Sequence, residues 1–285
     1  MTSSTDAPVL GVVVVHFRSE DTVVDTVSDV RAVAPDERIV LVDNSGTLEP
    51  GDFAVRVVAP EVNGGYAGGV NRGVAELPAD VDTVLVVTHE VRVDPASVTA
   101  MTADLTDGVG QVGPVLVDAS SPDGAIWSAG GHYSRFLAYP RHRLSVDDRA
   151  EVGWIDGAVF VSPRAAFDAV GGVPEHFFSY MEDIAYSRSL LAAGYRVTVS
   201  PAARAEQSGK GPSIRLAVRN RWLLLREFFP PVVATAGVAQ LHLKARLLAL
   251  VPTAFHRDRA REYRAGLTDA RRIHAERRAA LQEAS

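Results

Sequence analysis

The sequence contains no cysteine among its 285 residues, and this absence excludes several classes of protein. Disulfide scaffolds, thiolate zinc sites and cysteine nucleophiles all need a side chain that the chain lacks. The apolar run at residues 9–15 has the length of a strand and is far too short to span a membrane. The remaining composition, 47% hydrophobic and 22% charged, is that of an ordinary globular protein.

Acidic residues are scarce in the last part of the chain, although the net charge of −6 hides this. From Lys210 onward there are 15 Lys and Arg against 6 Asp and Glu, whereas the first 209 residues hold 14 against 29. A basic tail on an acidic body is suited to phosphates, either of a membrane surface or of an anionic substrate. Ion pairs along a solvated helix explain the same composition equally well.

The first eight residues lack the basic stretch and apolar core of a secretory signal. We therefore expect a cytoplasmic protein, located at the inner face of the membrane if the basic tail binds lipid. We do not expect nucleic-acid binding, because the body is acidic and the basic residues fall on helices without interleaved aromatics.

Apolar runs of strand length alternate with helical segments along the first 212 residues. This alternation predicts βαβ units on a mostly parallel sheet flanked by helices, with the carboxyl ends of the strands at one edge. We predict an α/β domain over 1–212 and a helical C-terminal extension over 213–285, which would make acceptor, oligomer or membrane-surface contacts. Strands are expected at 9–16, 38–42, 55–58, 82–87, 111–117, 159–162 and 196–200, and helices at 20–34, 65–77, 95–105, 164–170, 184–193, 214–229, 232–254 and 257–284.

Polar residues follow two of the predicted strands. Asp43 and Asn44 come after the second strand, and His89 and Glu90 after the fourth. Ligands of open α/β sheets bind at the carboxyl ends of strands, so these residues predict a site. Asp43 could accept the N3–H of a pyrimidine base, and Glu90 could bind a divalent cation that bridges a diphosphate. The alternatives are an Asx turn at Asp43 and an exposed loop acid at Glu90.

Residues 63–73, Asn-Gly-Gly-Tyr-Ala-Gly-Gly-Val-Asn-Arg-Gly, form a glycine-rich segment at the start of a predicted helix. Glycines allow the backbone to approach a ligand, and a helix N-terminus offers N–H donors to an anion. The segment has no Gly-Lys-Ser/Thr and follows the third strand, so it is neither a P-loop nor a dinucleotide fingerprint. A tight helix–sheet contact is the alternative.

Glu182 and Asp183 follow an aromatic stretch, residues 176–181, and open the helix predicted over 184–193. The aromatics would exclude water, and the positive end of the helix would face the acids. One carboxylate could then take a proton from an incoming hydroxyl. The alternative is a pair of acids on the solvated first turn of an ordinary helix.

In this order the segments resemble the family 2 glycosyltransferases of the GT-A (Rossmann-like) fold, and within them the rhamnosyltransferase-like branch. The resemblance covers residues 9–229. It rests on residues 12–17 (Val-Val-Val-Val-His-Phe), 41–45 (Leu-Val-Asp-Asn-Ser), 63–73, 156–158 (Asp-Gly-Ala), 169–178, Glu182-Asp183, Arg188, 193–195 (Ala-Gly-Tyr) and 219–221 (Arg-Asn-Arg).

The resemblance implies transfer of a sugar, with rhamnose or another deoxysugar favoured, from a dTDP- or UDP-linked donor to an acceptor hydroxyl. Asp183 would be the general base, Glu182 would orient groups beside it, and one in-line displacement would invert the anomeric carbon. The stretch 122–149 and the C-terminal helices would select the acceptor. The implied donor-binding residues are His16, Asp43, Asn44, Asn63, Gly64, Asn71, His89, Gly157 and Ala158.

The chain departs from the family at both usual metal positions. Thr88-His89-Glu90 stands where the family has an Asp-containing motif, and Gln207 stands where many members have His. Three readings remain open. Glu90 could hold Mg²⁺ or Mn²⁺ with help from His89, or transfer could be metal-independent with Lys210 or arginines on the diphosphate. The third reading is a sugar-nucleotide-binding homologue without activity.

Two further expectations concern a competing enzyme class, the nucleotidyltransferases, and the basic C-terminal helices. A nucleotidyltransferase would need a glycine-rich loop after the first strand, where residues 16–19 contain no glycine. The helix expected at 232–254 carries His242, Lys244 and Arg246, so it is a packing or interfacial helix and not a span. Core packing or a homodimer is favoured over peripheral membrane contact for this helix.

Overall fold

The computed structural model describes residues 8–146, 151–208, 211 and 213–283. Within these residues the chain divides into two compact units. Unit 1 comprises Met1–His132, His142–Phe178 and Glu182–Gly209, and unit 2 comprises Tyr133–Arg141, Ser179–Met181 and Lys210–Ser285. Two short internal segments, Tyr133–Arg141 and Ser179–Met181, thus belong to unit 2 and not to unit 1.

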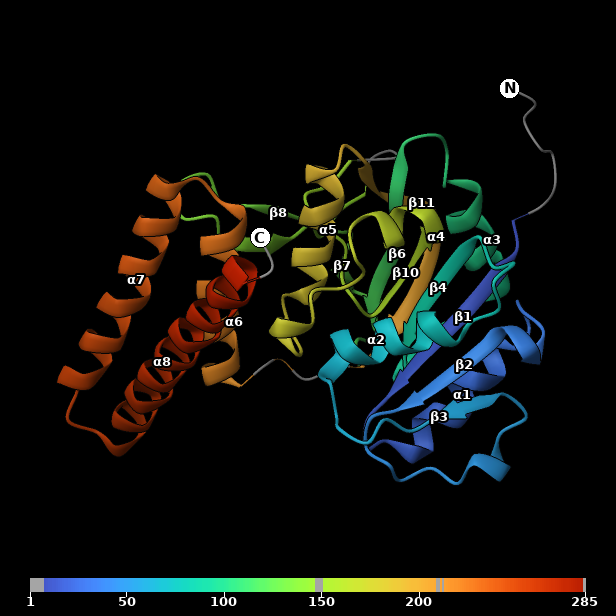
Figure 1. Ribbon diagram of the computed structural model, residues 1–285, viewed down its shortest axis with the longest axis horizontal. Coiled ribbons are helices and arrows are strands. Elements are labelled where there is room, and N and C mark those ends of the chain that lie inside the picture. Colours follow the sequence, from blue (N-terminus) through green and yellow to red (C-terminus); the bar gives the residue numbers. More distant parts are fainter. Residues whose placement is uncertain (1–7, 147–150, 209–210, 212, 284–285) are drawn as a thin grey trace. The chain divides into compact units, whose positions relative to one another are not determined.

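Unit 1 is built on one sheet with helices on both faces (Figure 1). Its strands are β1 (Leu10–His16), β2 (Ile39–Asp43), β3 (Arg56–Val58), β4 (Thr83–Thr88), β5 (Val91–Val93), β6 (Val109–Asp118), β7 (Ile126–Ser128), β10 (Val159–Pro163) and β11 (Arg196–Gln207). Its helices are α1 (Glu20–Val30), α2 (Gly65–Glu76), α3 (Pro95–Ala103), α4 (Arg164–Ala169) and α5 (Glu182–Ala192), with short 3₁₀ turns at Asp36–Arg38, Pro50–Asp52 and Glu175–Phe177. Strands β8 (Gly131–Tyr133) and β9 (Pro140–His142) form a separate two-stranded sheet.

The strand order is β3-β2-β1-β4-β10-β6-β11-β5, with β7 paired to β6. The first four strands are parallel, as the alternating pattern predicted. The second half is mixed: β10 runs antiparallel to both β4 and β6, and β5 runs antiparallel to β11. An apolar strand is equally buried in either direction, so its pattern does not reveal the antiparallel course of β10.

Two apolar clusters lie on opposite faces of the sheet. On one face the sheet packs against α1 and α3, through residues such as Val27 and Met101. On the other face the sheet packs against α2, α4 and α5, through residues such as Val74, Phe167 and Leu190. Burial on both faces explains the continuous apolar strands of the sequence.

Strand β11 is the largest departure from the predicted elements. It continues from Arg196 to Gln207, seven residues beyond the expected end at 200, with a register shift between Val199 and Arg204 against β6. Pro201 and the polar residues after it hide the continuation, because proline is rare inside a paired strand. The added length brings Gln207 opposite Val91 of β5, a short strand that the sequence did not predict.

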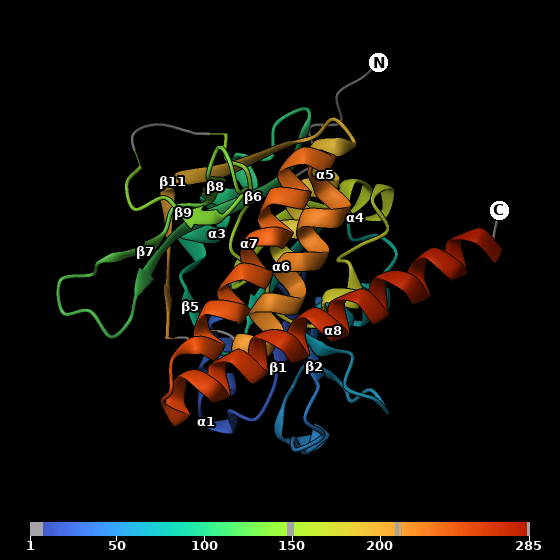
Figure 2. The same ribbon diagram turned by 90° about the vertical axis from the view of Figure 1, so that its left-hand side faces the viewer.

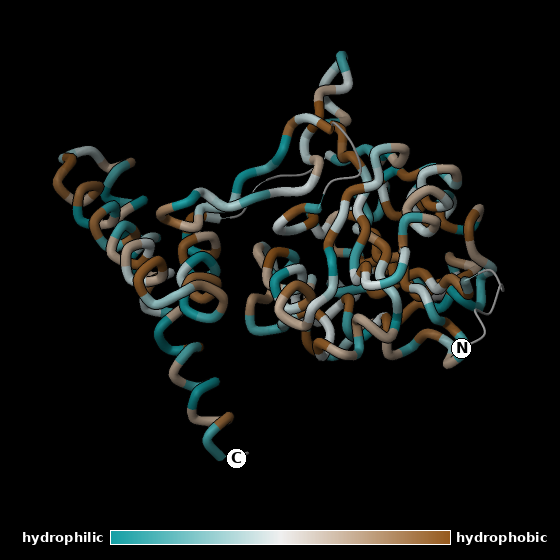
Figure 3. Tube along the Cα trace, turned by 90° about the horizontal axis from the view of Figure 1, so that it is seen from above, coloured by the Kyte–Doolittle hydropathy of each residue, from teal (hydrophilic) through white to brown (hydrophobic). Residues whose placement is uncertain are grey.

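Unit 2 contains α6 (Ile214–Phe228), α7 (Pro231–Leu250) and α8 (Ala254–Glu283). Figure 2 shows α8 crossing α6 and α7, and the C-terminal stretch of α8 is largely hydrophilic (Figure 3). Ser213 caps α6 by accepting a hydrogen bond from the N–H of Leu216 at 3.3 Å. All three helices match the predicted segments to within a few residues.

Two buried residues of α6 hold the short internal segments in unit 2. The side-chain amide of Asn220 donates to the carbonyls of Ser179 and Tyr180, the first at 2.8 Å. The Arg221 guanidinium lies 4.2 Å from the ring centre of Tyr139 and donates to the carbonyl of Leu137 at 3.2 Å. These contacts give the Arg-Asn-Arg stretch at 219–221 a packing role inside unit 2.

Candidate active site

The carboxyl ends of β1, β2 and β4 lie side by side in unit 1. In the parallel register His16 is opposite Asp43, and Val15 is opposite Thr88. The structure thereby brings together the strand-end residues that the sequence singled out. They are His16, Asp43, Asn44, His89 and Glu90.

The segment 156–158 joins this edge because β10 runs antiparallel to β4. Ala158 accepts a hydrogen bond from the N–H of Thr88 at 2.9 Å, just before Val159 pairs with Val87. Gly157 and Ala158 therefore lie directly beside the turn that carries His89.

Asp183 is anchored at the N-terminus of α5 against this segment. One carboxylate oxygen accepts from the N–H of Gly157 at 3.0 Å, and the other from the N–H of Ile184 at 2.7 Å. A Cβ added to Gly157 would lie 3.0 Å from the Cβ of Asp183, so a side chain there would require Asp183 to shift. Glu182, the other member of the pair, is buried with 5% of its surface exposed.

The surroundings of Asp183 favour its protonated form. Burial, followed by the negative charge of Asp156, raises the pKa of Asp183 to about 7, although three backbone hydrogen bonds oppose the shift. Tyr66 of α2 lies against the same segment, where its hydroxyl donates to the carbonyl of Gly157. Burial and then Glu182 and Asp183 hold the pKa of Tyr66 well above its usual value, so the phenol stays neutral.

The pKa of Asp183 makes a prediction about stability. The carboxyl binds its proton more tightly in the folded chain than at the ordinary value of 3.8, so its contribution to stability is lost as pH rises from about 4 to 7. Asp183→Asn removes this titration. Between these pH values the free energy of unfolding of the variant should fall less than that of the unmodified chain, by on the order of 1 kcal/mol or more. The melting temperature of the variant should therefore also fall less. Equal slopes in thermal unfolding scans would contradict the raised pKa.

The glycine-rich segment packs against the backbone that precedes the acid pair. Gly65 has φ of +73°, and a Cβ there would lie 2.1 Å from the carbonyl oxygen of Phe178. The same carbonyl accepts from the N–H of Ala67 at 3.2 Å. Phe178 itself has φ of +65°, a conformation that non-glycine residues rarely adopt. One of the first N–H groups of α2 thus binds the protein itself.

His16 and His89 form a ring pair at the strand ends. Their centroids are 5.2 Å apart, edge to face. His16 is fully buried, and both of its ring nitrogens lack a hydrogen-bond partner among the described residues. Burial and then the His89 charge lower the pKa of His16, which keeps the ring neutral. Nδ1 of His89 lies 3.2 Å from the carbonyl of Val15, and a proton on that nitrogen leaves Nε2 for a ligand.

Several predicted donor-binding residues organise loops. The Asp43 carboxylate accepts from the backbone N–H groups of Ser45, Gly46 and Leu48, an Asx-type arrangement. Burial raises the pKa of Asp43, but hydrogen bonds from the Leu48 N–H and from the hydroxyl and N–H of Ser45 outweigh it and bring the pKa below its usual value. The side chain of Asn44 donates to the carbonyl of Gly65 at 2.8 Å.

The asparagines of the glycine-rich segment have similar roles. Asn63 accepts from the N–H of Gly65 at 2.8 Å, directly beside Gly64. Asn71 donates to the carbonyl of Val173 at 2.8 Å and accepts from its N–H at 2.8 Å. Their contacts with a nucleotide, and that of Asp43, stay predictions.

The altered metal positions lie next to each other. Gln207 pairs with Val91, the residue after Glu90, and its buried side-chain oxygen has no hydrogen-bond partner among the described residues. However, no group of three or more His, Cys, Asp or Glu in the described part of the chain could hold a metal ion. The described side chains therefore do not by themselves complete a divalent-cation site. Lys210 lies outside the described residues.

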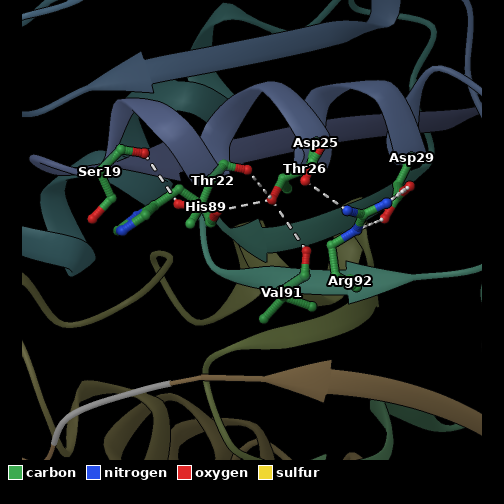
Figure 4. Close-up of polar contacts among 8 residues, drawn as sticks. All are labelled: Ser19, Thr22, Asp25, Thr26, Asp29, His89, Val91 and Arg92. Carbon is green, nitrogen blue, oxygen red and sulfur yellow. Dashed lines mark hydrogen bonds and ion pairs between the residues drawn. The ribbon is translucent and has the colours of Figure 1, made fainter. Parts of the chain in front are cut away.

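Helix α1 fixes the turn that carries His89 and Glu90 (Figure 4). The buried hydroxyl of Thr26 lies 2.8 Å from the carbonyl of His89 and 3.1 Å from that of Val91. Arg92, which follows this turn, also contacts α1 through ion pairs with Asp29 at 2.6 Å and Asp25 at 2.9 Å. The carbonyl of Thr22, one turn earlier in α1, lies 3.3 Å from the same Thr26 hydroxyl, whose single proton is closest to the His89 carbonyl.

Thr26→Val should loosen this turn without changing the volume of the core. Valine keeps the shape but removes the hydroxyl that donates to this turn, so the free energy of unfolding should fall by about 1–3 kcal/mol. The turn should also exchange its amide hydrogens faster at His89 and Val91. Thr22→Val, one turn earlier on an exposed part of α1, is the matched control and should have little effect. Unchanged stability in chemical denaturation of Thr26→Val would contradict this role.

Three residues at the site were not predicted from the sequence. Tyr66 lies inside the quoted glycine-rich segment, and Asp156 inside the quoted Asp-Gly-Ala. Trp127 reaches Asp156 from β7, with its indole N–H 3.3 Å from the carboxylate. An aromatic between glycines was a usable signal for Tyr66, whereas Trp127 depends on long-range pairing of β7 with β6.

Comparison with known proteins identifies the class of the fold. No protein-family model matches the chain. Solved structures with the same fold include GalNAc-T7 with UDP, GalNAc and Mn²⁺ (TM-score 0.62, 14% identity, 92% of this chain and 55% of that one). Others are the mannosyltransferase PcManGT of Pyrobaculum calidifontis with GDP-Man and Mn²⁺ (0.54, 14%, 93% and 88%) and S. aureus TarS 1-349 (0.57, 12%, 95% and 91%). The chain therefore has the GT-A glycosyltransferase fold, and it spans little more than half of the GalNAc-T7 chain.

A curated relative gives a closer comparison. The N-acetylglucosaminyl-diphospho-decaprenol L-rhamnosyltransferase of Mycobacterium tuberculosis, from strains CDC 1551 / Oshkosh and ATCC 25618 / H37Rv, is 29% identical over 224 residues. The match covers 64% of this chain and 72% of the relative. The predicted resemblance to rhamnosyltransferase-like family 2 glycosyltransferases, and the predicted enzyme class, glycosyltransferase, are confirmed.

Proposed function

We propose that this glycosyltransferase moves a sugar, a deoxysugar such as rhamnose, from a nucleotide-diphosphate donor to an acceptor hydroxyl with inversion. The observation that supports this most directly is Asp183, held by Gly157 beside the end of β4 with a pKa of about 7. A carboxylate with a pKa near the working pH is an effective general base.

In the proposed reaction Asp183 takes the proton of the acceptor hydroxyl as its oxygen attacks the anomeric carbon. The bond from that carbon to the diphosphate breaks in the same step, and the nucleoside diphosphate leaves with the electron pair. A single displacement inverts the anomeric carbon and needs no second carboxylate. Tyr66 and Gly157 hold the segment against which the sugar would lie, and Glu182 would orient groups in the pocket.

The donor would lie along the carboxyl ends of β1, β2 and β4. The ordered loop after Asp43 offers an edge for the base, and the diphosphate would face the His89–Glu90 turn. The Nε2 atom of His89 would contact a phosphate oxygen, which requires a protonated imidazole. Because the metal positions hold Glu90 and Gln207, we propose that donor binding does not depend on a resident cation.

The acceptor is proposed from the relative alone. The name of the M. tuberculosis enzyme specifies N-acetylglucosaminyl-diphospho-decaprenol, a lipid-linked sugar. A lipid-linked diphosphate sugar is therefore our first candidate for the acceptor of this chain.

Calorimetric titration of dTDP, UDP and GDP tests the donor site, each with Mn²⁺ or Mg²⁺ and again with EDTA. We expect one nucleotide to bind in EDTA with little loss of affinity. Binding only in the presence of metal would restore Glu90 as a cation ligand, and no binding of any nucleotide would refute the donor site.

A second candidate is a sugar-nucleotide-binding homologue that does not turn over. The observation in its favour is the loss of both usual metal ligands at Glu90 and Gln207. It predicts nucleotide binding without release of nucleoside diphosphate from a sugar donor, with every acceptor tried.

A further inference from the structure

Helix α7 of unit 2 is apolar on two opposite faces. One face is buried through Ala234, Gly237, Val238, Leu241 and Ala245. The packing is close, since a Cβ on Gly237 would lie 2.7 Å from the side chain of Leu225 in α6. An amphipathic helix of a folded domain normally has one apolar face, so the second one on α7 needs an explanation.

The opposite face of α7 is exposed. Its residues recur every three or four positions, so they form one stripe along the helix. Val232 is 81% exposed, Leu243 56%, Leu247 53% and Leu250 77%. We call this the α7 stripe, and it consists of Val232, Ala236, Ala239, Leu243, Leu247 and Leu250. An apolar surface of this length on a folded chain marks a site of contact.

Positive charge surrounds the α7 stripe. Between residues 231 and 261 there are five Lys and Arg and one acid, Asp258, which is paired with Arg261 at 2.6 Å. Lys244 and Arg246 lie on α7 itself, which has no acidic residue. Arg257 and Arg259 follow on the first turns of α8.

An exposed aromatic continues this surface at the start of α8. Phe255 is 63% exposed, and the guanidinium of Arg259 lies 5.3 Å from the centre of its ring. An aromatic ring beside a cation is a side-chain pair suited to the boundary between lipid headgroups and acyl chains.

Charge decides which occupant fits this surface. In a two-fold dimer the same patch meets itself, so each copy would bring Lys244 and Arg246 against another cationic patch. Anionic lipid headgroups complement the cations, and the acyl region accepts the apolar side chains. None of the described helices is long and apolar enough to cross a membrane, so α7 would lie in the interface.

We propose that the α7 stripe, with Phe255 and the arginines at the start of α8, is a docking surface for an anionic lipid bilayer. This proposal goes beyond the transfer reaction and rests on unit 2 alone. It would place the protein on the surface where a lipid-linked acceptor resides.

Co-sedimentation of the full chain with lipid vesicles tests the proposal without any sugar donor. Vesicles of phosphatidylcholine mixed with phosphatidylglycerol should bind the protein, and those of phosphatidylcholine alone should bind it much more weakly. Binding should weaken as salt is raised, because the headgroup attraction is screened. Equal binding to both vesicles, or binding to neither, would overturn the proposal.

Variants assign the binding to this surface. Leu247→Asp with Leu250→Asp should reduce the partition coefficient at least about tenfold, because two apolar contacts are replaced by charges of the wrong sign. Arg246→Gln should reduce it about fivefold. Leu281→Asp makes the same type of change at a 67% exposed position near the end of α8 and should bind like the unmodified chain.

Two results would contradict the assignment. One is a double variant that binds vesicles as tightly as Leu281→Asp. The other is a stable dimer in analytical ultracentrifugation that Leu247→Asp dissociates, since the stripe would then be covered by a second copy. Nucleotide titration of each variant shows whether unit 1 is intact, so failure of docking and failure of the donor site remain distinguishable.

Discussion

Asp183→Asn should reduce sugar transfer by about a thousandfold or more while leaving the affinity for the donor nucleotide nearly unchanged. The amide is nearly the same size as the carboxylate but cannot accept the proton of the acceptor hydroxyl, and general-base catalysis is worth about 10²–10⁴ in rate. The measurement is release of nucleoside diphosphate in the presence of acceptor, beside calorimetric titration of the nucleotide. In the unmodified enzyme kcat/KM should fall on the acid side of about pH 7, where Asp183 takes up its proton.

The chain contains a matched control for this variant. Glu20 and Asp21 open α1 as Glu182 and Asp183 open α5, but Asp21 is exposed. Asp21→Asn therefore makes the same chemical change at the same position of a helix and should leave transfer intact. Full activity in Asp183→Asn would remove this residue from the role of base.

Gly65→Ala should destabilise unit 1 by about 2–4 kcal/mol and reduce transfer at least about a hundredfold. The new methyl group would lie 2.1 Å from the Phe178 carbonyl oxygen, and alanine is strained at φ of +73°. The carbonyl must move, and it belongs to the segment that leads into Glu182 and Asp183. Chemical denaturation and the transfer assay measure the two effects.

Gly68→Ala is the control for this prediction. Gly68 lies three residues later in the same helix, and a Cβ there meets no atom within 4 Å. Alanine should be neutral or stabilise the helix by up to about 1 kcal/mol. Similar behaviour of the two variants would show that the contact between α2 and Phe178 does not matter.

The first half of the sheet could be predicted because its signals are local. Strands β1, β2 and β4 are continuous apolar runs separated by helices with clear turn residues, and this pattern requires parallel crossovers. The antiparallel course of β10 and the extension of β11 depend on pairing with distant strands. No local pattern contains that information, and Pro201 wrongly indicates that the strand ends there.

Part of the candidate site could be predicted for a similar reason. The edge formed by His16, Asp43 and His89 follows from strand order, which the alternating pattern gives. The hydrogen bonds made by Asp43 and Asn71 within loops, and the contact of Tyr66 with Gly157, arise only after the segments meet. Sequence types alone could not distinguish a side chain that binds a ligand from one that holds a loop.

The helices of unit 2 were predicted from the sequence, but the two internal segments that belong to this unit were not. Residues 133–141 and 179–181 join it through Asn220 and Arg221, whose partners in these two segments are 40 or more residues away in sequence. The apolar spacing of α7 was visible in the sequence. Only the structure shows which of the two apolar faces of α7 is buried.

The most direct test of the proposed donor site is a crystal structure of the protein with the nucleoside diphosphate that binds best. We expect the diphosphate beside the His89–Glu90 turn and the segment 156–158, with the carboxylate of Asp183 facing the space where the sugar would begin. A nucleotide bound at any other part of the chain, or an Asp183 carboxylate turned away from the diphosphate, would contradict it.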